Sequence, residues 1–451
     1  MKFFLTVFYF AAVLSIFMFY YFRNKKLCKS DIATMENGSE YTKNHITPVL
    51  IFSMAFIAYS SIGMLDRTTD NTVDTATFFT FFLANFLGFI CFLIGYGSDK
   101  TTVRKRKLTN PFRVKWTPNK KITIGGTVIL AAFLFFVIIN IDVVTRMITD
   151  FGSGSSYLDY SIREERTAFS GLIQALEGYF SVFVLLLPFY RCYTKKKIGL
   201  LDIIIVLVYF SWALFSGDRT TLIVILLMAV VFINERYKNI NMKLIVIAVV
   251  AGLFMLILLG HLRRYNSIGE MLNMLLTEDL SSLLSLKGIG EFKNTTGTML
   301  NYIKSNSGPL DFQYFGVYIR ELLVWIPAFL FPNRPLPWAE QYMLDFYPNA
   351  PAGTGHGWFI LTDGYMAFGL LGIVVEMLIY GRLVKWSYKK FFENKKDAVI
   401  AFLYSYFLLF IFYSVRSSMM LTIKNYLISV FPVILIYFIF KKSFRNNAEV
   451  D

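Results

Sequence analysis

A histidine and an aspartate stand near the start of an apolar segment, in the stretch AGTGHGWFILTDGYMAFG at 352–369. His356 lies between Gly355 and Gly357, which leave the backbone open to a ligand. Asp363 follows about two helical turns later, on nearly the same face of a helix. Histidine can take up a proton near neutral pH or donate to a phosphate, and a helix start offers free N–H groups to an anion. We predict that both residues are catalytic, against the alternative that they are ordinary polar residues at an interface.

Arginines gather in segments that we place on the outer side of a membrane, where short loops normally contain few of them. Guanidinium groups bind phosphate oxygens through two parallel hydrogen bonds, so several at one depth suit a doubly charged phosphate. Taken singly, each arginine could instead be solvated or paired, as Arg320 could be with Glu321. We predict pyrophosphate or substrate binding by Arg163, Arg166, Arg219, Arg263, Arg264, Arg320, Arg334 and Arg416.

Other chemistries lack their usual signals. The predicted outer loops contain no Asp-x-Asp, no cysteine pair and no histidine pair at helical spacing, so we expect no metal site. The chain has no Gly-rich phosphate loop, and we expect neither ATP nor another cofactor. Glu177 and Glu376 are the main ionisable residues inside the apolar segments. Ion-coupled carriers usually need more, which makes a transporter less favoured.

The elements that must position these residues are apolar helices. The chain is 56% hydrophobic and 18% aromatic, and apolar runs of ~20 residues recur along it. We predict an all-α polytopic membrane protein that forms a single membrane domain over 1–451. About eleven transmembrane helices are expected, at 3–22, 48–65, 76–97, 122–142, 171–190, 199–216, 220–235, 242–260, 358–382, 398–414 and 420–440.

The positions of the basic residues predict the topology. Short Lys- and Arg-rich clusters separate the apolar runs, for example VRKRK at 103–107 and KWSYKK at 385–390, as in cytoplasmic loops. This pattern accounts for the net charge of +15 without nucleic acid as a partner. It places the N-terminus outside and the C-terminus in the cytoplasm. It also makes 261–357 a large external loop, which we expect to fold back on the bilayer surface and to cover a cavity.

Three motifs carry a resemblance to a known family. They are FSGDRTTL at 215–222, WIPAFLFPNRP at 325–335 and TDGYMAFGLLG at 362–372. Together with the number of spans and the late external loop, they resemble the bacterial O-antigen polymerases, the Wzy-type oligosaccharide repeat-unit polymerases. In this sequence Arg334 stands where the proline corner of the family often has Lys, and Asp363 where Glu is frequent.

The resemblance implies a fold similar to that of the GT-C glycosyltransferases and a site at the outer face of the bacterial plasma (inner) membrane. The implied donor and acceptor are glycans linked to undecaprenyl pyrophosphate, which are joined into an O antigen or a similar surface polysaccharide. Membrane lipids and a chain-length regulator protein are the implied partners. Two alternatives stay open: an O-antigen ligase, which uses the same donor, and a flippase for lipid-linked oligosaccharides.

Overall fold

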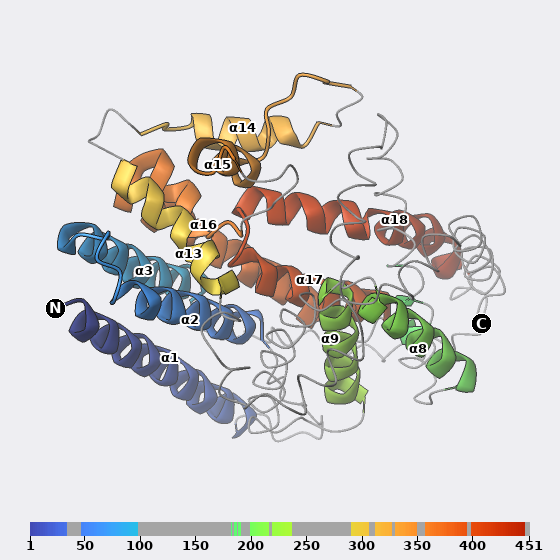
Figure 1. Ribbon diagram of the computed structural model, residues 1–451. Helices are drawn as coiled ribbons and strands as arrows, with labels where there is room; N and C mark the ends of the chain where they lie inside the picture. The colour runs from blue at the N-terminus through green and yellow to red at the C-terminus, as the bar shows by residue number, and fades with distance from the viewer. Residues whose placement is uncertain are drawn as a thin grey trace, which may run out of the picture. The chain divides into compact units, whose positions relative to one another are not determined.

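The computed structural model describes residues 1–33, 47–97, 182, 185–186, 188–190, 199–215, 219–236, 290–305, 312–326, 330–349, 357–394 and 398–446. Every regular element in these ranges is an α-helix (Figure 1). The prediction of an all-α protein is therefore confirmed for the described part of the chain. The chain forms two compact units, of which the first comprises 1–102, 289–393 and 410–424, and the second 103–288, 394–409 and 425–451.

The first unit contains the elements that matter most for function. Helices α1, α2, α3 and α13 lie side by side, because α1 and α13 each contact both α2 and α3 (Figure 1). The end of α17 and the start of α18 also belong to this unit. The bounds are α1 (Lys2–Ala33), α2 (Pro48–Arg67), α3 (Thr75–Tyr96), α13 (Gly290–Ser305), α14 (Gly316–Val324), α15 (Trp338–Phe346), α16 (Leu361–Asn394), α17 (Ala398–Ser414) and α18 (Met419–Asn446).

The second unit contains α8 (Leu200–Phe215) and α9 (Arg219–Arg236), which contact each other, and the remaining parts of α17 and α18. Phe402 on α17 packs its ring against Phe189 at a centroid distance of 5.7 Å. The Tyr426 hydroxyl on α18 donates to the Leu403 carbonyl at 3.3 Å, which holds α18 against α17 within this unit.

Local sequence signals explain where several helices begin. Pro48 occupies the first turn of α2, where its missing N–H has no helical partner to lose. Asp74 is the N-cap of α3, and its Oδ2 accepts hydrogen bonds from the N–H groups of Ala76 and Thr77 at 3.1 Å each. A hydrogen bond from the Thr77 side chain, and after it these backbone hydrogen bonds, lower the pKa of Asp74.

Small residues let α3 and α16 approach closely. A Cβ atom on Gly95 would overlap the Leu378 carbonyl oxygen, and one on Gly381 would overlap the Phe92 carbonyl oxygen. Glycine at such positions is typical of helix packing in membranes, where close backbone contact replaces the hydrophobic effect. An aromatic core fills the space beside this contact. Phe52 packs against Phe92 and Tyr380 at centroid distances of 3.9 Å and 5.7 Å, and Phe92 and Tyr380 lie 5.9 Å apart.

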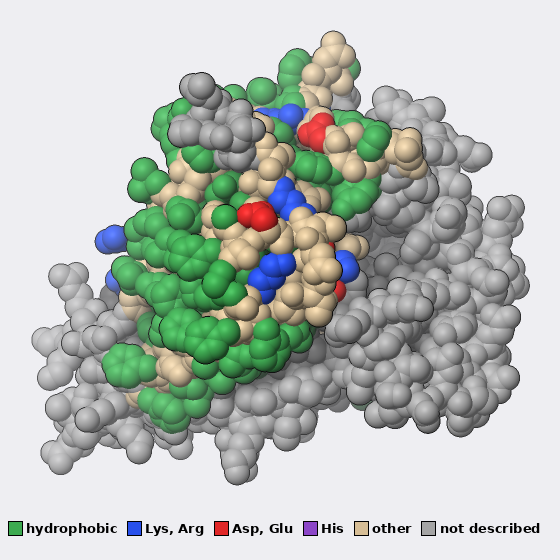
Figure 2. All heavy atoms as spheres, turned by 60° about the vertical axis from the view of Figure 1, so that its left-hand side comes forward, with side chains coloured by type: hydrophobic (Ala, Val, Ile, Leu, Met, Phe, Trp, Pro, Cys, Tyr) green, Lys and Arg blue, Asp and Glu red, His purple; other side chains and the backbone are tan. Residues whose placement is uncertain are grey.

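Exposed apolar side chains cover much of the first unit. Figure 2 shows that they form a broad surface, interrupted by a small group of basic and acidic side chains. Among the large exposed residues are Phe3, Phe4, Ile94, Leu371 and Trp386. Soluble proteins rarely expose contiguous apolar patches above a few hundred Å². The surface is that of a protein which contacts lipid.

Four helices among the described residues are long and apolar enough to cross a membrane: Lys2–Phe22, Pro48–Arg67, Thr75–Tyr96 and Leu361–Phe391. They coincide with four of the predicted spans. The predicted spans at 122–142 and 242–260 lie outside the described residues, as does most of 171–190. The count of eleven, the single domain over 1–451 and the GT-C-like arrangement stay predictions.

Candidate functional site

Helix α16 is interrupted at Gly369 and the residue before it, where the backbone angles are not helical. Gly369 has a φ of 62°, a region that glycine adopts without steric cost. The break frees two carbonyl oxygens of the preceding turn. Met366 O accepts from the N–H of Gln313 at 2.9 Å, and Ala367 O accepts from the N–H of Tyr314 at 3.1 Å. The segment 313–314, in the predicted external loop, thus supplies the hydrogen bonds that the broken helix lacks.

The two halves of α16 touch each other across the break. A Cβ atom on Gly372 would overlap the Gly364 carbonyl oxygen, so the backbones are in direct contact. A Cβ atom on Gly364 would stand 2.7 Å from Glu376 Oε2 and 2.8 Å from the Ile373 nitrogen. Only glycine at these two positions leaves room for the Glu376 carboxylate beside the other half of the helix.

Two buried carboxylates lie on either side of the break. Asp363 is 1% exposed and Glu376 is 4% exposed. Asp363 Oδ1 accepts a hydrogen bond from Trp358 Nε1 at 2.7 Å, and the Met419 backbone amide is a second hydrogen-bonding partner. Glu376 Oε2 accepts from the Tyr318 hydroxyl at 3.2 Å, whereas its Oε1 has no partner among the described residues. These carboxylates therefore link α16 to α14 and to the start of α18.

Glu321 on α14 is a third buried carboxylate, also 1% exposed. Its Oε2 accepts from the Ser418 hydroxyl at 3.1 Å, and Ser418 Oγ accepts from the N–H of Leu421, so Ser418 caps α18. Burial raises the pKa of Glu321, while the Ser418 hydrogen bond and the charges of Lys424 and Arg320 act in the opposite direction. The carboxylate joins the middle of α14 to the start of α18.

Two cations converge on the C-terminal end of α14. Arg334 Nη1 donates to the carbonyl oxygens of Val324 at 3.0 Å and Ile326 at 2.9 Å, and Lys424 Nζ donates to the same Val324 oxygen at 2.7 Å. The carbonyls at a helix end lack helical partners and carry partial negative charge. In the described part of the chain, neither cation has a carboxylate within ion-pairing distance. We call Arg334 and Lys424 the cation pair.

Arg320 has a different environment. Its Nε donates to the Leu336 carbonyl at 3.0 Å, its Nη2 donates to Gln341 Oε1 at 2.7 Å, and its guanidinium lies 4.2 Å from the centre of the Trp338 ring. These contacts take the place of the ion pair with Glu321 that the sequence made possible, because Glu321 lies on the buried face of α14 and bonds to Ser418 instead. Arg320 thus joins α14 to α15.

Residues 358–360, which follow His356 in the sequence, are held by backbone hydrogen bonds. The N–H of Trp358 donates to the Arg416 carbonyl at 3.1 Å, and the N–H of Ile360 donates to the Val415 carbonyl at 3.2 Å. Trp358 also belongs to a buried core between α14, α15 and α16, which consists of Val317, Trp338, Tyr342, Met343, Trp358, Met366 and Ala367. The position of residues 358–360 is therefore fixed by the turn between α17 and α18.

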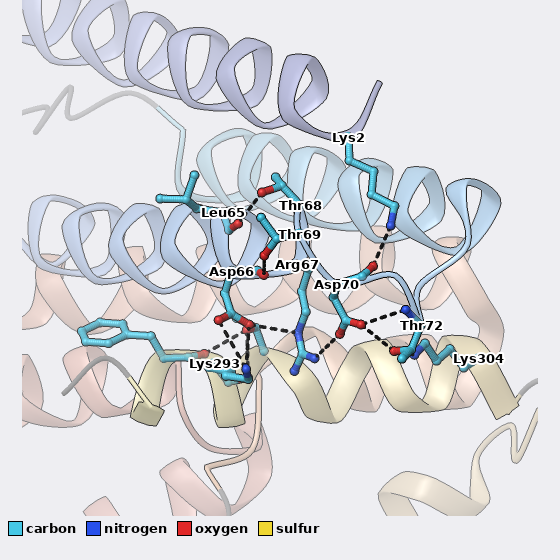
Figure 3. A network of polar contacts seen from close by, with 12 residues as sticks. Lys2, Leu65, Asp66, Arg67, Thr68, Thr69, Asp70, Thr72, Lys293 and Lys304 are labelled. Atoms are coloured by element: carbon cyan, nitrogen blue, oxygen red, sulfur yellow. Dashed lines mark hydrogen bonds and ion pairs between the residues drawn. The ribbon is translucent and has the colours of Figure 1, made fainter. Parts of the chain in front are cut away.

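A second polar cluster, which we call the α13 anchor, joins α13 to the turn between α2 and α3 (Figure 3). Arg67 Nη1 binds Asp70 Oδ2 at 2.9 Å. Asp70 Oδ1 accepts from the Thr72 hydroxyl at 2.6 Å and from the Thr72 N–H at 2.9 Å. The Thr72 hydrogen bonds, and after them Arg67, lower the pKa of Asp70. The α13 anchor consists of Lys2, Asp66, Arg67, Asp70, Thr72, Lys293 and Lys304.

Lysines complete this anchor from two other helices. Lys293 Nζ lies 3.3 Å from Asp66 Oδ2, and Lys304 Nζ donates to the Thr72 hydroxyl at 3.2 Å, both from α13. Lys2 Nζ on α1 donates to the Asp70 carbonyl at 2.8 Å (Figure 3). The N-terminal end of α1, the α2–α3 turn and α13 therefore meet at one end of the helices, and the predicted topology places all three outside.

The structure brings together only some of the predicted site residues. Asp363, Arg320, Arg334 and Arg416 all lie in the first unit. The carbonyl of Arg416 accepts the hydrogen bond from the Trp358 N–H, and its guanidinium lies 5.5 Å from the centre of the Tyr413 ring. Arg219 is the first residue of α9, in the second unit. The residues outside the described ranges are His356, Arg163, Arg166, Arg263 and Arg264.

Four residues of this site were not predicted from the sequence. Lys424 stood inside a predicted span, and its charge there was the signal that could have singled it out. Glu376 was noted only as one of few ionisable residues in a span, and Glu321 only as a partner for Arg320. Trp358 gave no signal beyond its place next to the Gly-rich entrance at 352–357.

Comparison with known proteins identifies the family. The family model of the O-antigen polysaccharide polymerase Wzy matches residues 1–447, so the chain belongs to that family. No curated protein and no solved structure matches the chain.

Proposed function

We propose that this member of the Wzy family joins oligosaccharide repeat units linked to undecaprenyl pyrophosphate into a surface polysaccharide at the outer face of the bacterial plasma membrane. Family membership supports a polymerase in general. The observation that carries the finer proposal is the cation pair, in which Arg334 of the predicted external loop and Lys424 of α18 meet at the end of α14. A chain-length regulator protein is a proposed partner of the same reaction.

The cation pair suits the leaving group of this reaction. When the growing glycan leaves its carrier, the bond between its anomeric carbon and a phosphate oxygen breaks, and negative charge develops on the departing pyrophosphate. Arg334 and Lys424 are held beside each other by neutral carbonyls, and N–H groups that these carbonyls do not use can bind phosphate oxygens. Donors fixed in place before the reaction stabilise developing charge without reorganisation.

A further donor belongs to the backbone segment that holds the cation pair. Trp325 stands between Val324 and Ile326, the two residues whose carbonyls hold the pair, and its Nε1 is buried without a partner among the described residues. A buried donor without a partner costs free energy, and an anion at this place would satisfy it. We propose that the pyrophosphate group approaches the end of α14, with Arg320 on the neighbouring turn.

The acceptor is the other half of the reaction. A hydroxyl of the terminal sugar on a second lipid-linked unit attacks the anomeric carbon and releases its proton as the carbon gains positive character. We propose His356 as the group that orients this hydroxyl or takes its proton. Both hydrogen bonds of Asp363 run to groups of the protein, Trp358 and Met419. This arrangement favours a role in which Asp363 positions the segment that follows His356.

Reconstitution tests the proposed function. The purified full-length chain in liposomes receives undecaprenyl-pyrophosphate-linked repeat units, EDTA and no nucleotide. We expect a ladder of longer glycans, because the leaving lipid supplies the free energy and the sequence gives no signal for a metal or a nucleotide site. A loss of activity in EDTA that one metal restores would contradict the metal-free reaction. Transfer only to added lipid A core would indicate a ligase, and movement of the lipid across the bilayer without lengthening would indicate a flippase.

A further inference from the structure

Helix α14 buries a charged side chain and exposes apolar ones, the reverse of a helix on a water-facing surface. Its buried face contains Val317, Glu321 and Val324, of which Glu321 is a carboxylate. Its exposed face carries Ile319 (56% exposed) and Leu322 (49%), and the row continues with Phe315 (67%) just before the helix and Ile326 (37%) just after it. Their spacing of four, three and four residues puts them on one side of the helix. A helix that faced water on this side would show the opposite pattern.

The row continues an apolar row on α16. Phe315 contacts Phe368 of α16, with ring centroids 5.1 Å apart and nearly perpendicular planes. From the next turn onward, α16 exposes one apolar residue on each turn along a single face: Leu371, Val375, Ile379, Leu383 and Trp386. This second row lies on a helix that is long and apolar enough to cross a membrane. The exposed face of α14 is thus continuous with the lipid-facing side of a membrane span.

The length of the row on α16 locates α14 along the membrane normal. Exposed basic residues begin at Arg382 and end at Lys389 and Lys390 in the last part of α16. From Phe368 the helix rises ~21 Å to Arg382 and ~32 Å to Lys389, at ~1.5 Å per residue. These two lengths bracket a hydrocarbon layer of ~30 Å, and the aliphatic stem of Arg382 can follow the apolar surface while its charge reaches the headgroups. If the lysines stand at one boundary of the layer, then Phe368, and with it Phe315, stands at the other.

We propose that α14 lies in the lipid–water interface of the leaflet opposite Lys389 and Lys390, with Phe315, Ile319, Leu322 and Ile326 inserted among the acyl chains. The partner is the bilayer lipid itself. Interfacial helices bind in this way, with an apolar face a few Å below the headgroups. The positive-inside pattern makes this leaflet the outer one.

This position has a consequence for Arg320 and the cation pair. They lie on or beside α14, and basic side chains at this depth are level with lipid phosphate groups. A lipid-linked pyrophosphate would then meet them without leaving the plane of the membrane. The placement of α14 rests on the chain being a membrane protein and does not rest on the polymerase reaction, so its failure would leave the proposed function standing.

Spin labels test the placement in the full-length protein. Cys28, Cys91 and Cys192 are replaced by serine, and single cysteines are introduced as Ile319→Cys and Leu322→Cys on the exposed row. Leu371→Cys on α16 is the control for a lipid-facing site, and Glu340→Cys on α15 is the control for an exposed polar site. Each variant carries a nitroxide in nanodiscs of phosphatidylethanolamine and phosphatidylglycerol. The accessibility of the label to oxygen, which partitions into lipid, is compared with its accessibility to a water-soluble nickel chelate.

We expect the ratio of oxygen to nickel accessibility at 319 and 322 to resemble that at 371 and to exceed that at 340 several-fold. Ratios at 319 and 322 that equal the ratio at 340 would show that α14 faces water and would overturn the proposal. Low accessibility to both reagents would show that another protein surface, or a second copy of the chain, covers the row, and would overturn it as well.

Discussion

The α13 anchor and the site around α14 are both polar clusters of the first unit, but their charges are arranged differently. In the anchor each acidic side chain binds a basic one, as Arg67 binds Asp70 and Lys293 binds Asp66, and the cluster is partly exposed. Around α14 the carboxylates of Glu321, Asp363 and Glu376 are buried, and each accepts hydrogen bonds from neutral donors. The cation pair binds carbonyl oxygens.

The difference indicates which charged side chains can bind another molecule. Surface ion pairs contribute little to stability, about 0–1 kcal/mol each, and paired charges leave weak fields around them. Cations that neutral carbonyls hold are not engaged in an ion pair and can bind an anion that arrives later. We therefore interpret the α13 anchor as a structural joint and the cation pair as the place where a pyrophosphate binds. The predictions that follow test this division.

The largest effect is expected at the cation pair. Lys424→Gln and Arg334→Gln should each lower the rate of glycan lengthening in liposomes by about 10²–10³-fold, or ~3–4 kcal/mol in the transition state. Lys424→Arg should recover part of the rate, because it keeps the charge. The matched control is Lys304→Gln in the α13 anchor, which should stay within about twofold of the wild type, as expected for an exposed contact. Equal losses in Lys424→Gln and Lys304→Gln would remove the distinction between the two clusters.

A smaller effect is expected at Asp363, on stability. Asp363→Ala leaves the buried Trp358 Nε1 and the Met419 N–H without an acceptor, and should lower the free energy of unfolding by about 1–3 kcal/mol. Asp363→Asn keeps an acceptor oxygen and should lose less. Thermal unfolding in detergent measures both variants. If Asp363→Asn is as stable as the wild type but inactive, the carboxylate has a chemical role beyond holding Trp358.

The smallest effect is expected in the anchor. Asp70→Ala should lower the free energy of unfolding by about 1 kcal/mol, because the carboxylate is partly exposed. The pKa of Asp70 in the folded protein lies below its ordinary value of ~4, so its contribution is present above that value and is lost as the pH falls. Thermal unfolding of the wild type and the variant should differ at pH 7 and converge in acid. A difference that grows in acid would contradict the assigned hydrogen bonds.

Much of the helical framework could be predicted because its causes are local. The apolar runs gave α2, α3 and the main part of α16 to within a few residues, since a membrane span requires ~20 consecutive apolar residues. Asp74 directly before an apolar run is a typical N-cap. The prediction of the family rested on short motifs and is confirmed by the match over 1–447.

The site could be predicted only in part because its causes lie far apart in the sequence. The Phe-Gly pair of the TDGYMAFGLLG motif marks the break in α16, but the groups that stabilise the break come from Gln313 and Tyr314, more than a span away. Lys424 meets Arg334 only because both reach the end of α14. No periodicity in the sequence indicates that these two residues lie close together.

Inhibition by the leaving lipid tests the central proposal most directly, because it reports on pyrophosphate binding apart from the chemical step. Undecaprenyl pyrophosphate and undecaprenyl monophosphate are each added to the lengthening reaction of the wild type, Arg334→Gln and Lys424→Gln. We expect the inhibition constant of the pyrophosphate to rise about 10–100-fold in each variant, as for the loss of one charge-assisted hydrogen bond. The preference for the pyrophosphate over the monophosphate should shrink accordingly. Inhibition constants equal to those of the wild type, with the preference unchanged, would show that the pyrophosphate binds elsewhere.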